Sequence, residues 1–123
     1  MDRYLLVMLG AAFGGAARYA LYTVITERML SKFPYGTVIV NITGCFLIGL
    51  AMPFFLDGAP SLQNWRLLLV TGVLGGYTTF SSFMWEAFQS SSAGDRAIAL
   101  ANIVASVVLG FLAVWCGTLI TRR

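Results

Sequence analysis

Long apolar runs separated by short charged connections dominate this sequence. Four segments carry almost no charged side chains, at about residues 4–26, 33–56, 67–88 and 97–120. Each has roughly the 20 residues that a helix needs to cross a hydrocarbon core about 30 Å thick. The connections contain the Gly, Pro and Ser residues that are typical of turns. The pattern predicts an all-α membrane protein in which residues 1–123 form a single domain of four transmembrane helices.

The composition favours a membrane protein and disfavours an enzyme. Charged residues make up 11 % of the chain, against roughly a quarter in an average soluble domain. The chain has no His and two Cys, so it lacks the usual ligands of zinc and the usual base of a catalytic triad. The basic residues behind the net charge of +3 form no patch, so we expect no nucleic-acid partner. We therefore expect a protein embedded in a lipid bilayer that is not an enzyme.

Charges in the connections give almost no signal for orientation in the membrane. With four crossings, one side holds Arg3, Arg66, Arg122 and Arg123, and the other side holds Arg28, Lys32 and Arg96. An oriented protein instead concentrates its basic residues on the cytoplasmic side. A chain that inserts both ways can pair with an inverted copy of itself. We therefore predict a dual-topology, antiparallel homodimer.

In the first span, small residues and one charge recur at helical spacing. Gly10, Gly14 and Arg18 follow one another at i+4 and share a face of the helix. Glycines at this spacing favour close packing against another helix. A charge inside a membrane is costly unless it is paired, hydrated or able to reach the interface. Arg18 therefore either snorkels toward the interface or acts electrostatically on anions.

Polar stripes mark the second and fourth spans. Thr37, Asn41 and Gly44 share one face of the second span, and Asn102 and Ser106 share one face of the fourth. A buried amide without a hydrogen-bond partner is costly. Asn41 therefore either bonds to a neighbouring helix or lines an aqueous or ion path. The stripe on the fourth span either packs against another helix or lines a narrow path.

The third span interrupts its own helical pattern near the middle of the membrane. Gly75 and Gly76 precede Tyr77, Thr78 and Thr79, and this run propagates a helix poorly. Unwound backbone is tolerated in a bilayer only where protein covers it or where it lines a cavity. In transporters, broken helices of this kind supply the carbonyl and amide groups of ion sites. We predict a broken third helix with an ion site at the break, the alternative being a kink in which the threonine hydroxyls bond back to their own helix.

Three motifs of the sequence resemble those of the Fluc (CrcB-type) bacterial fluoride channels. They are GGAARY at residues 14–19, GTVIVNITGCF at residues 36–46 and GVLGGYTTFSSF at residues 72–83. The resemblance covers essentially the whole chain, including its four spans. It implies a dual-topology, antiparallel homodimer with two fluoride pores and a structural sodium ion at the dimer centre. It also implies passive export of cytoplasmic fluoride across the bacterial inner membrane, and hence fluoride resistance.

The residue types in these motifs suit a fluoride path. A small, strongly hydrated anion needs N–H and O–H donors in place of its water, and each contact must be weak enough for the ion to leave. The expected donors are Thr37, Asn41, Thr79, Ser81, Ser82 and, on the fourth span, Ser106. The positive ring edges of Phe80 and Phe83 can receive an anion without trapping it. We expect Arg18 to raise the anion concentration near the path, and the backbone carbonyls of Gly75 and Thr78 to hold the sodium ion.

A small proton-coupled multidrug exporter is the competing class, because such proteins also have four helices and dual topology. An exporter of this kind needs a carboxylate within the membrane that exchanges protons for a cationic drug. All five acidic residues lie at or near the end of a span, which leaves Glu86 as the one candidate. A third class, a structural subunit that only packs against larger membrane proteins, would explain neither the broken third helix nor Asn41.

Overall fold

The regular elements of the chain are all helical in the computed structural model, which describes residues 2–56 and 58–121. In chain order they are α1 (Arg3–Met29), α2 (Tyr35–Leu56), the 3-10 turn η1 (Pro60–Leu62), α3 (Gln63–Arg66), the π-helical η2 (Leu67–Leu74), α4 (Gly75–Tyr77), α5 (Phe80–Ser92) and α6 (Arg96–Thr121). Four helical stretches are long and apolar enough to cross a membrane, the third of them running from Pro60 to Ser92. The predicted all-α architecture with four membrane-spanning helices is confirmed. Arg122 and Arg123, two of the basic residues counted for orientation, lie outside the described residues.

The third span is longer at both ends than the sequence pattern predicts. The pattern limits it to residues 67–88, whereas the helical stretch begins at Pro60 and ends at Ser92. Proline suits the first turn of a helix because its missing N–H would have no partner there. Residues 60–66 and 89–92 are more polar than the stretch between them, so the hydropathy pattern omits them although they are helical.

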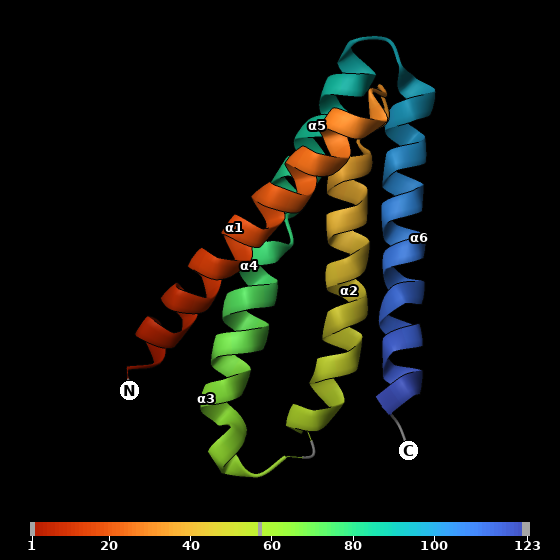
Figure 1. Ribbon diagram of the computed structural model, residues 1–123. Coiled ribbons are helices and arrows are strands. Elements are labelled where there is room, and N and C mark those ends of the chain that lie inside the picture. The colour runs from red at the N-terminus through yellow and green to blue at the C-terminus, as the bar shows by residue number, and fades with distance from the viewer. Residues whose placement is uncertain (1, 57, 122–123) are drawn as a thin grey trace.

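Glycines bring α1 close to the third span, as their spacing predicts. α1 crosses η2 and α4 at an angle (Figure 1). A Cβ added to Gly10 would lie 2.8 Å from the Cα of Gly72, and one added to Gly76 would lie 2.8 Å from the Cα of Ala11. A Cβ added to Gly14 would clash with the carbonyl of Val73. The backbones therefore approach more closely than any larger residue permits, and the packing interpretation of these glycines is confirmed.

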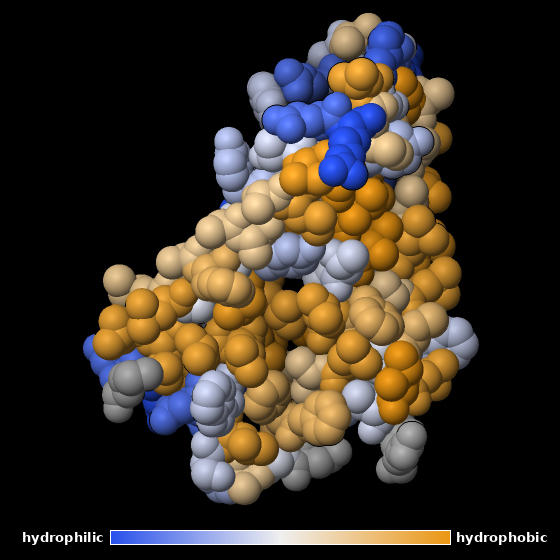
Figure 2. Space-filling model, in the orientation of Figure 1, coloured by the Kyte–Doolittle hydropathy of each residue, from blue (hydrophilic) through white to orange (hydrophobic). Residues whose placement is uncertain are grey.

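The remaining helices stand side by side and carry apolar side chains outward. α2 and α6 pack along each other, and a tight turn joins α5 to α6 (Figure 1). Gly94 in that turn has φ 89°, a left-handed value that favours glycine. Figure 2 shows hydrophobic residues across the middle of one face and hydrophilic residues at its upper end, where the turn between α5 and α6 lies. Such a band matches a protein whose middle lies in lipid.

The predicted break lies between α4 and α5. Thr78 and Thr79 leave the helical conformation with extended φ, ψ values of −82°, 157° and −146°, 118°. Before the break, η2 winds as a π-helix, a form that is rare and often found at functional sites. The third span is therefore two helical segments joined by two extended residues, and the prediction of a broken third helix is confirmed.

Candidate functional site

The backbone groups of the two extended residues all find partners inside the protein. The Thr78 N–H donates to the Leu74 carbonyl at 3.1 Å, as it would in a continuous helix. The Thr78 carbonyl accepts from the Arg18 guanidinium at 3.5 Å. The Thr79 N–H and carbonyl both bond to the side chain of Asn41. Lipid offers no hydrogen bonds, so these contacts make an extended segment tolerable within the membrane.

Asn41 acts like one residue of a neighbouring strand. Its Oδ1 accepts from the Thr79 N–H at 2.8 Å, and its Nδ2 donates to the Thr79 carbonyl at 2.9 Å. Of the two alternatives for this buried amide, the structure therefore contains the hydrogen bond to another helix. One N–H of the amide remains for a further acceptor. Its role as a fluoride donor stays a prediction.

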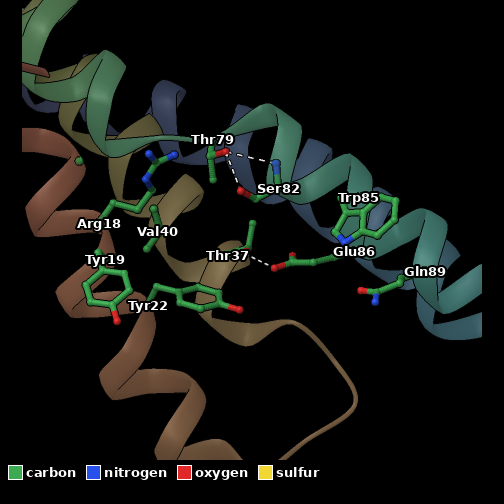
Figure 3. A pocket seen from close by; sticks show the side chains of 11 residues that line it. Arg18, Tyr19, Tyr22, Thr37, Val40, Thr79, Ser82, Trp85, Glu86 and Gln89 are labelled. Atoms are coloured by element: carbon green, nitrogen blue, oxygen red, sulfur yellow. Dashed lines mark hydrogen bonds between the residues drawn. The ribbon is translucent and has the colours of Figure 1, made fainter.

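Arg18 projects from α1 toward the break rather than toward the membrane surface. Figure 3 shows its side chain extending to the segment that carries Thr79, above the ring of Tyr19. Its contact with the Thr78 carbonyl places a permanent cation next to the break. The electrostatic alternative for Arg18 requires such a position, and that role stays a prediction.

A pocket of about 520 Å³ opens between α1, α2 and α5 beside the break (Figure 3). Four of the predicted site residues contribute to its wall, namely Arg18, Thr37, Thr79 and Ser82. The other lining residues are Gly15, Tyr19, Tyr22, Val40, Trp85, Glu86 and Gln89. A guanidinium group, a carboxylate and several hydroxyl groups therefore surround a single cavity at the depth where the third helix is interrupted.

Glu86 belongs to this pocket, although its place near the predicted end of the third span favours a surface position. Because α5 continues to Ser92, Glu86 lies well inside the helix. Its Oε1 accepts a hydrogen bond of 2.6 Å from the Thr37 hydroxyl, and its Oε2 is buried without a hydrogen-bond partner. The sequence signal that could have placed Glu86 in a site is that it is the single acid within an otherwise uncharged stretch of the third span.

Thr79 starts α5 and orders the hydroxyl groups next to it. Its Oγ1 accepts from the Ser82 N–H at 3.2 Å and donates to the Ser82 hydroxyl at 3.0 Å. This is an N-cap, which satisfies one of the free N–H groups at the start of a helix. The Ser81 hydroxyl lies 3.5 Å from the same oxygen. The N-terminus of α5, where the helix dipole favours an anion, therefore faces the break with three hydroxyl groups around it.

A second pocket, of about 290 Å³, lies beside the break and shares Thr79 with the first. Its wall contains Asn41, Gly75, Thr78 and Phe80 together with apolar residues of α2 and η2. Thr79 donates its N–H to Asn41, so it does not bond to the carbonyl of Gly75, its partner in a continuous helix. The Thr78 hydroxyl does bond back to Leu74, at 3.1 Å. The Thr78 hydroxyl thus bonds back to its own helix at the break, but the Gly75 carbonyl remains without its helical hydrogen-bond donor.

The two phenylalanines are in contact and differ in exposure. Their ring centroids are 5.9 Å apart with the planes tilted by 59°. Phe83 is 5 % exposed, whereas Phe80 is 74 % exposed and lines the second pocket. Aromatic pairs prefer tilted arrangements of this kind to face-to-face stacking. The two rings contact each other at i, i+3 spacing, and their role in conduction stays a prediction.

On α6, Asn102 rather than Ser106 has a free hydrogen-bond donor. The Ser106 hydroxyl donates to Asn102 Oδ1 at 3.2 Å. Asn102 is 1 % exposed, and its Nδ2 has no hydrogen-bond partner. Ser106, Ser81 and Phe83 line neither of the two pockets at the break. The structure therefore brings most of the predicted residues to the break and leaves these three outside its cavities.

Comparison with known proteins identifies the family of this chain. A family model described as "CrcB-like protein, Camphor Resistance (CrcB)" matches residues 5–118. The fluoride-specific ion channel FluC of Solibacter usitatus is 51 % identical over 121 residues, which cover 98 % of this chain and 99 % of the relative. The FluC proteins of Acidobacterium capsulatum and Coxiella burnetii are each 45 % identical, over 98 % and 97 % of this chain and 97 % of each relative. With a match over nearly its whole length, the chain belongs to the CrcB-like protein family.

Proposed function

We propose that this protein is a passive, fluoride-selective ion channel. The observation that carries the proposal is the broken third helix, whose two extended residues join two pockets inside a bundle of membrane-spanning helices. It is supported by the family match and by relatives that are named fluoride-specific ion channels. A multi-pass membrane protein of this class carries out transport and is not an enzyme.

The chemistry around the break suits a small anion. The start of α5 supplies the positive end of a helix dipole, and Ser81 and Ser82 add hydroxyl donors. Phe80 offers a ring edge, whose partial positive charge attracts an anion without the strength of a full cation. Arg18 supplies the one permanent positive charge of the first pocket. Several weak contacts of this kind let an ion lose its water, bind and leave again.

The multidrug exporter receives no support from these relatives, all of which are named fluoride channels. Its essential feature is a carboxylate that is free to exchange a proton for a cationic drug. Glu86 is the one acid in the first pocket, and its Oε1 is engaged by the Thr37 hydroxyl at 2.6 Å. The Arg18 guanidinium in the same pocket offsets the carboxylate charge that would attract a cationic drug.

The functional unit of the proposal is an antiparallel homodimer in the bacterial inner membrane. The second pocket is incomplete in one protomer, because Gly75 and Phe80 on its rim are exposed. A second copy in the opposite orientation would cover this rim. The nearly balanced basic residues of the sequence agree with insertion in both orientations.

A structural sodium ion at the centre of the dimer fits the donor set of the second pocket. The Gly75 carbonyl lacks its helical partner, and the Thr78 carbonyl keeps one lone pair beyond its contact with Arg18. The described residues contain no group of three or more acidic, His or Cys side chains that could hold a metal ion. Uncharged oxygen ligands without a carboxylate suit a monovalent cation. When bound, the ion would add positive charge beside the anion path.

Flux from liposomes that contain only this protein tests the proposal. We expect rapid, passive fluoride efflux down its gradient, with little chloride efflux under the same conditions. Proton flux that depends on a cationic drug would favour an exporter instead. Absence of fluoride efflux from liposomes that contain folded protein would refute the proposed function.

A further inference from the structure

A third cavity, of about 180 Å³, lies between the α1–α2 connection and the end of α5. Its wall is built from Thr26, Met29 and residues 31–36 at the connection and from polar residues of α5. Tyr22, Glu86 and Gln89 line both this cavity and the 520 Å³ pocket at the break. The two cavities are therefore neighbours that share walls, and together they reach from the middle of the bundle to its end.

Lys32 is the one basic residue in the wall of this third cavity. Its Nζ lies 3.1 Å from Asp95 Oδ2, in the turn between α5 and α6. The Lys32 side chain is 76 % exposed and that of Asp95 is 37 % exposed, so both groups are in contact with water. A pair this exposed contributes little to stability. Its position at the outer cavity gives it an electrostatic effect on ions that pass there.

We propose that the 180 Å³ cavity is the water-facing mouth of the fluoride path in each protomer. Lys32 concentrates fluoride at this mouth, and Asp95 weakens this effect of Lys32. The inference rests on the proposed function and extends it to the access route. An anion that leaves bulk water meets Lys32 first and Arg18 next, at the inner pocket. Asp95 holds the ammonium group and offsets part of its charge.

The size of the effect follows from Coulomb attraction through water. A unit charge roughly 10 Å from an ion in water changes the ion's local concentration about two-fold. Salt screens this attraction over about 30 Å at 0.01 M and about 3 Å at 1 M. The contribution of Lys32 should therefore be present in dilute salt and absent in concentrated salt. A structural defect would lower flux under both conditions.

The role of Lys32 at the mouth is tested by the initial rate of fluoride efflux from liposomes, measured at about 0.01 M and about 1 M background salt. We expect Lys32→Gln to lower efflux about two-fold in dilute salt and to match the parent in concentrated salt. Lys32→Arg keeps the charge and should behave as the parent does. Asp95→Asn should raise efflux in dilute salt. Asn serves as well as Asp just before a helix, so this change should leave α6 intact.

Arg66→Gln is the matched control, because it removes one positive charge from α3, at the opposite end of the protomer (Figure 1). If Lys32→Gln leaves efflux unchanged in dilute salt, or if it acts no more strongly than Arg66→Gln, the proposed mouth is wrong. A loss that persists in concentrated salt also contradicts it, since screening removes a purely electrostatic effect. These results are distinct from failure of the proposed function, which is read from the parent protein alone.

Discussion

Gly75 and Gly76 are neighbours in α4, and the structure predicts opposite consequences of replacing each by alanine. A Cβ added to Gly75 would have the Val70 carbonyl as its nearest atom, at 3.8 Å, which is an ordinary contact. A Cβ added to Gly76 would lie 2.6 Å from the Ala11 carbonyl oxygen and 2.8 Å from the Ala11 Cα. Within one protomer, Gly75→Ala is therefore tolerated, and Gly76→Ala separates α1 from the third span.

The proposed dimer reverses the expectation for Gly75. If two breaks face each other at the centre of the dimer, the added methyl groups meet the partner backbone. Overpacking of this kind typically costs about 1–3 kcal/mol, which corresponds to a dimer dissociation constant raised roughly 5- to 150-fold. The folded protomer should be unharmed, since alanine is favoured over glycine in a helix by about 1 kcal/mol.

The assay separates assembly from folding. The dimer fraction in lipid would be followed against protein density by single-molecule photobleaching, helical content by circular dichroism, and fluoride efflux in liposomes. We expect Gly75→Ala to keep its helical content and lose dimer and efflux, and Gly76→Ala to lose thermal stability as well. A Gly75→Ala protein that assembles and conducts like the parent would show that this face of α4 does not meet a partner.

Three further predictions concern the path and the assembly. Asn41→Ser should destabilise the protein by about 1–3 kcal/mol for each hydrogen bond lost at Thr79. Asn41→Asp should be destabilised as well, because a carboxylate cannot donate to the Thr79 carbonyl. It should also stop fluoride efflux, because its negative charge repels the anion. Normal efflux through Asn41→Asp would show that Asn41 does not face the fluoride path. Phe80→Ile and Phe83→Ile should each cut efflux sharply while the dimer elutes normally in size-exclusion chromatography, and unchanged efflux in both would remove the rings from the path. Lysines added to residues 27–32 or to residues 57–66 should each inactivate the channel alone and restore it when the two variants are co-expressed, whereas full efflux from one strongly biased variant contradicts an antiparallel dimer.

The helices and the break are accessible from the sequence because each depends on residues close together in the chain. Charge-free runs identify membrane spans, and Gly75-Gly76 before three poor helix formers identifies the interruption. The limits of the third span are not accessible in this way. Residues 60–66 are too polar to register as lipid-facing, although they are helical.

The partners of the polar side chains depend on how helices pack, and a single sequence does not contain that information. Asn41 and Thr79 are 38 residues apart, and Thr37 and Glu86 are 49 residues apart. Spacing within one helix correctly marks Asn41 as needing a partner, but it cannot name Thr79. The Ser106 hydroxyl donates to Asn102 four residues earlier on the same helix, a contact that spacing alone allows, and its role as a donor to the ion stays a prediction.

The hydrogen bonds at the break have a consequence for how the chain enters the membrane. Arg18 bonds to the Thr78 carbonyl and Asn41 bonds to the carbonyl and the N–H of Thr79, and both residues precede the break in the sequence. During synthesis α1 and α2 therefore enter the bilayer before the interrupted span, so the hydrogen-bond partners of the break are in the membrane when that span inserts. A circular permutant that begins at the third span would present bare peptide groups to lipid, and its insertion would fail at that step.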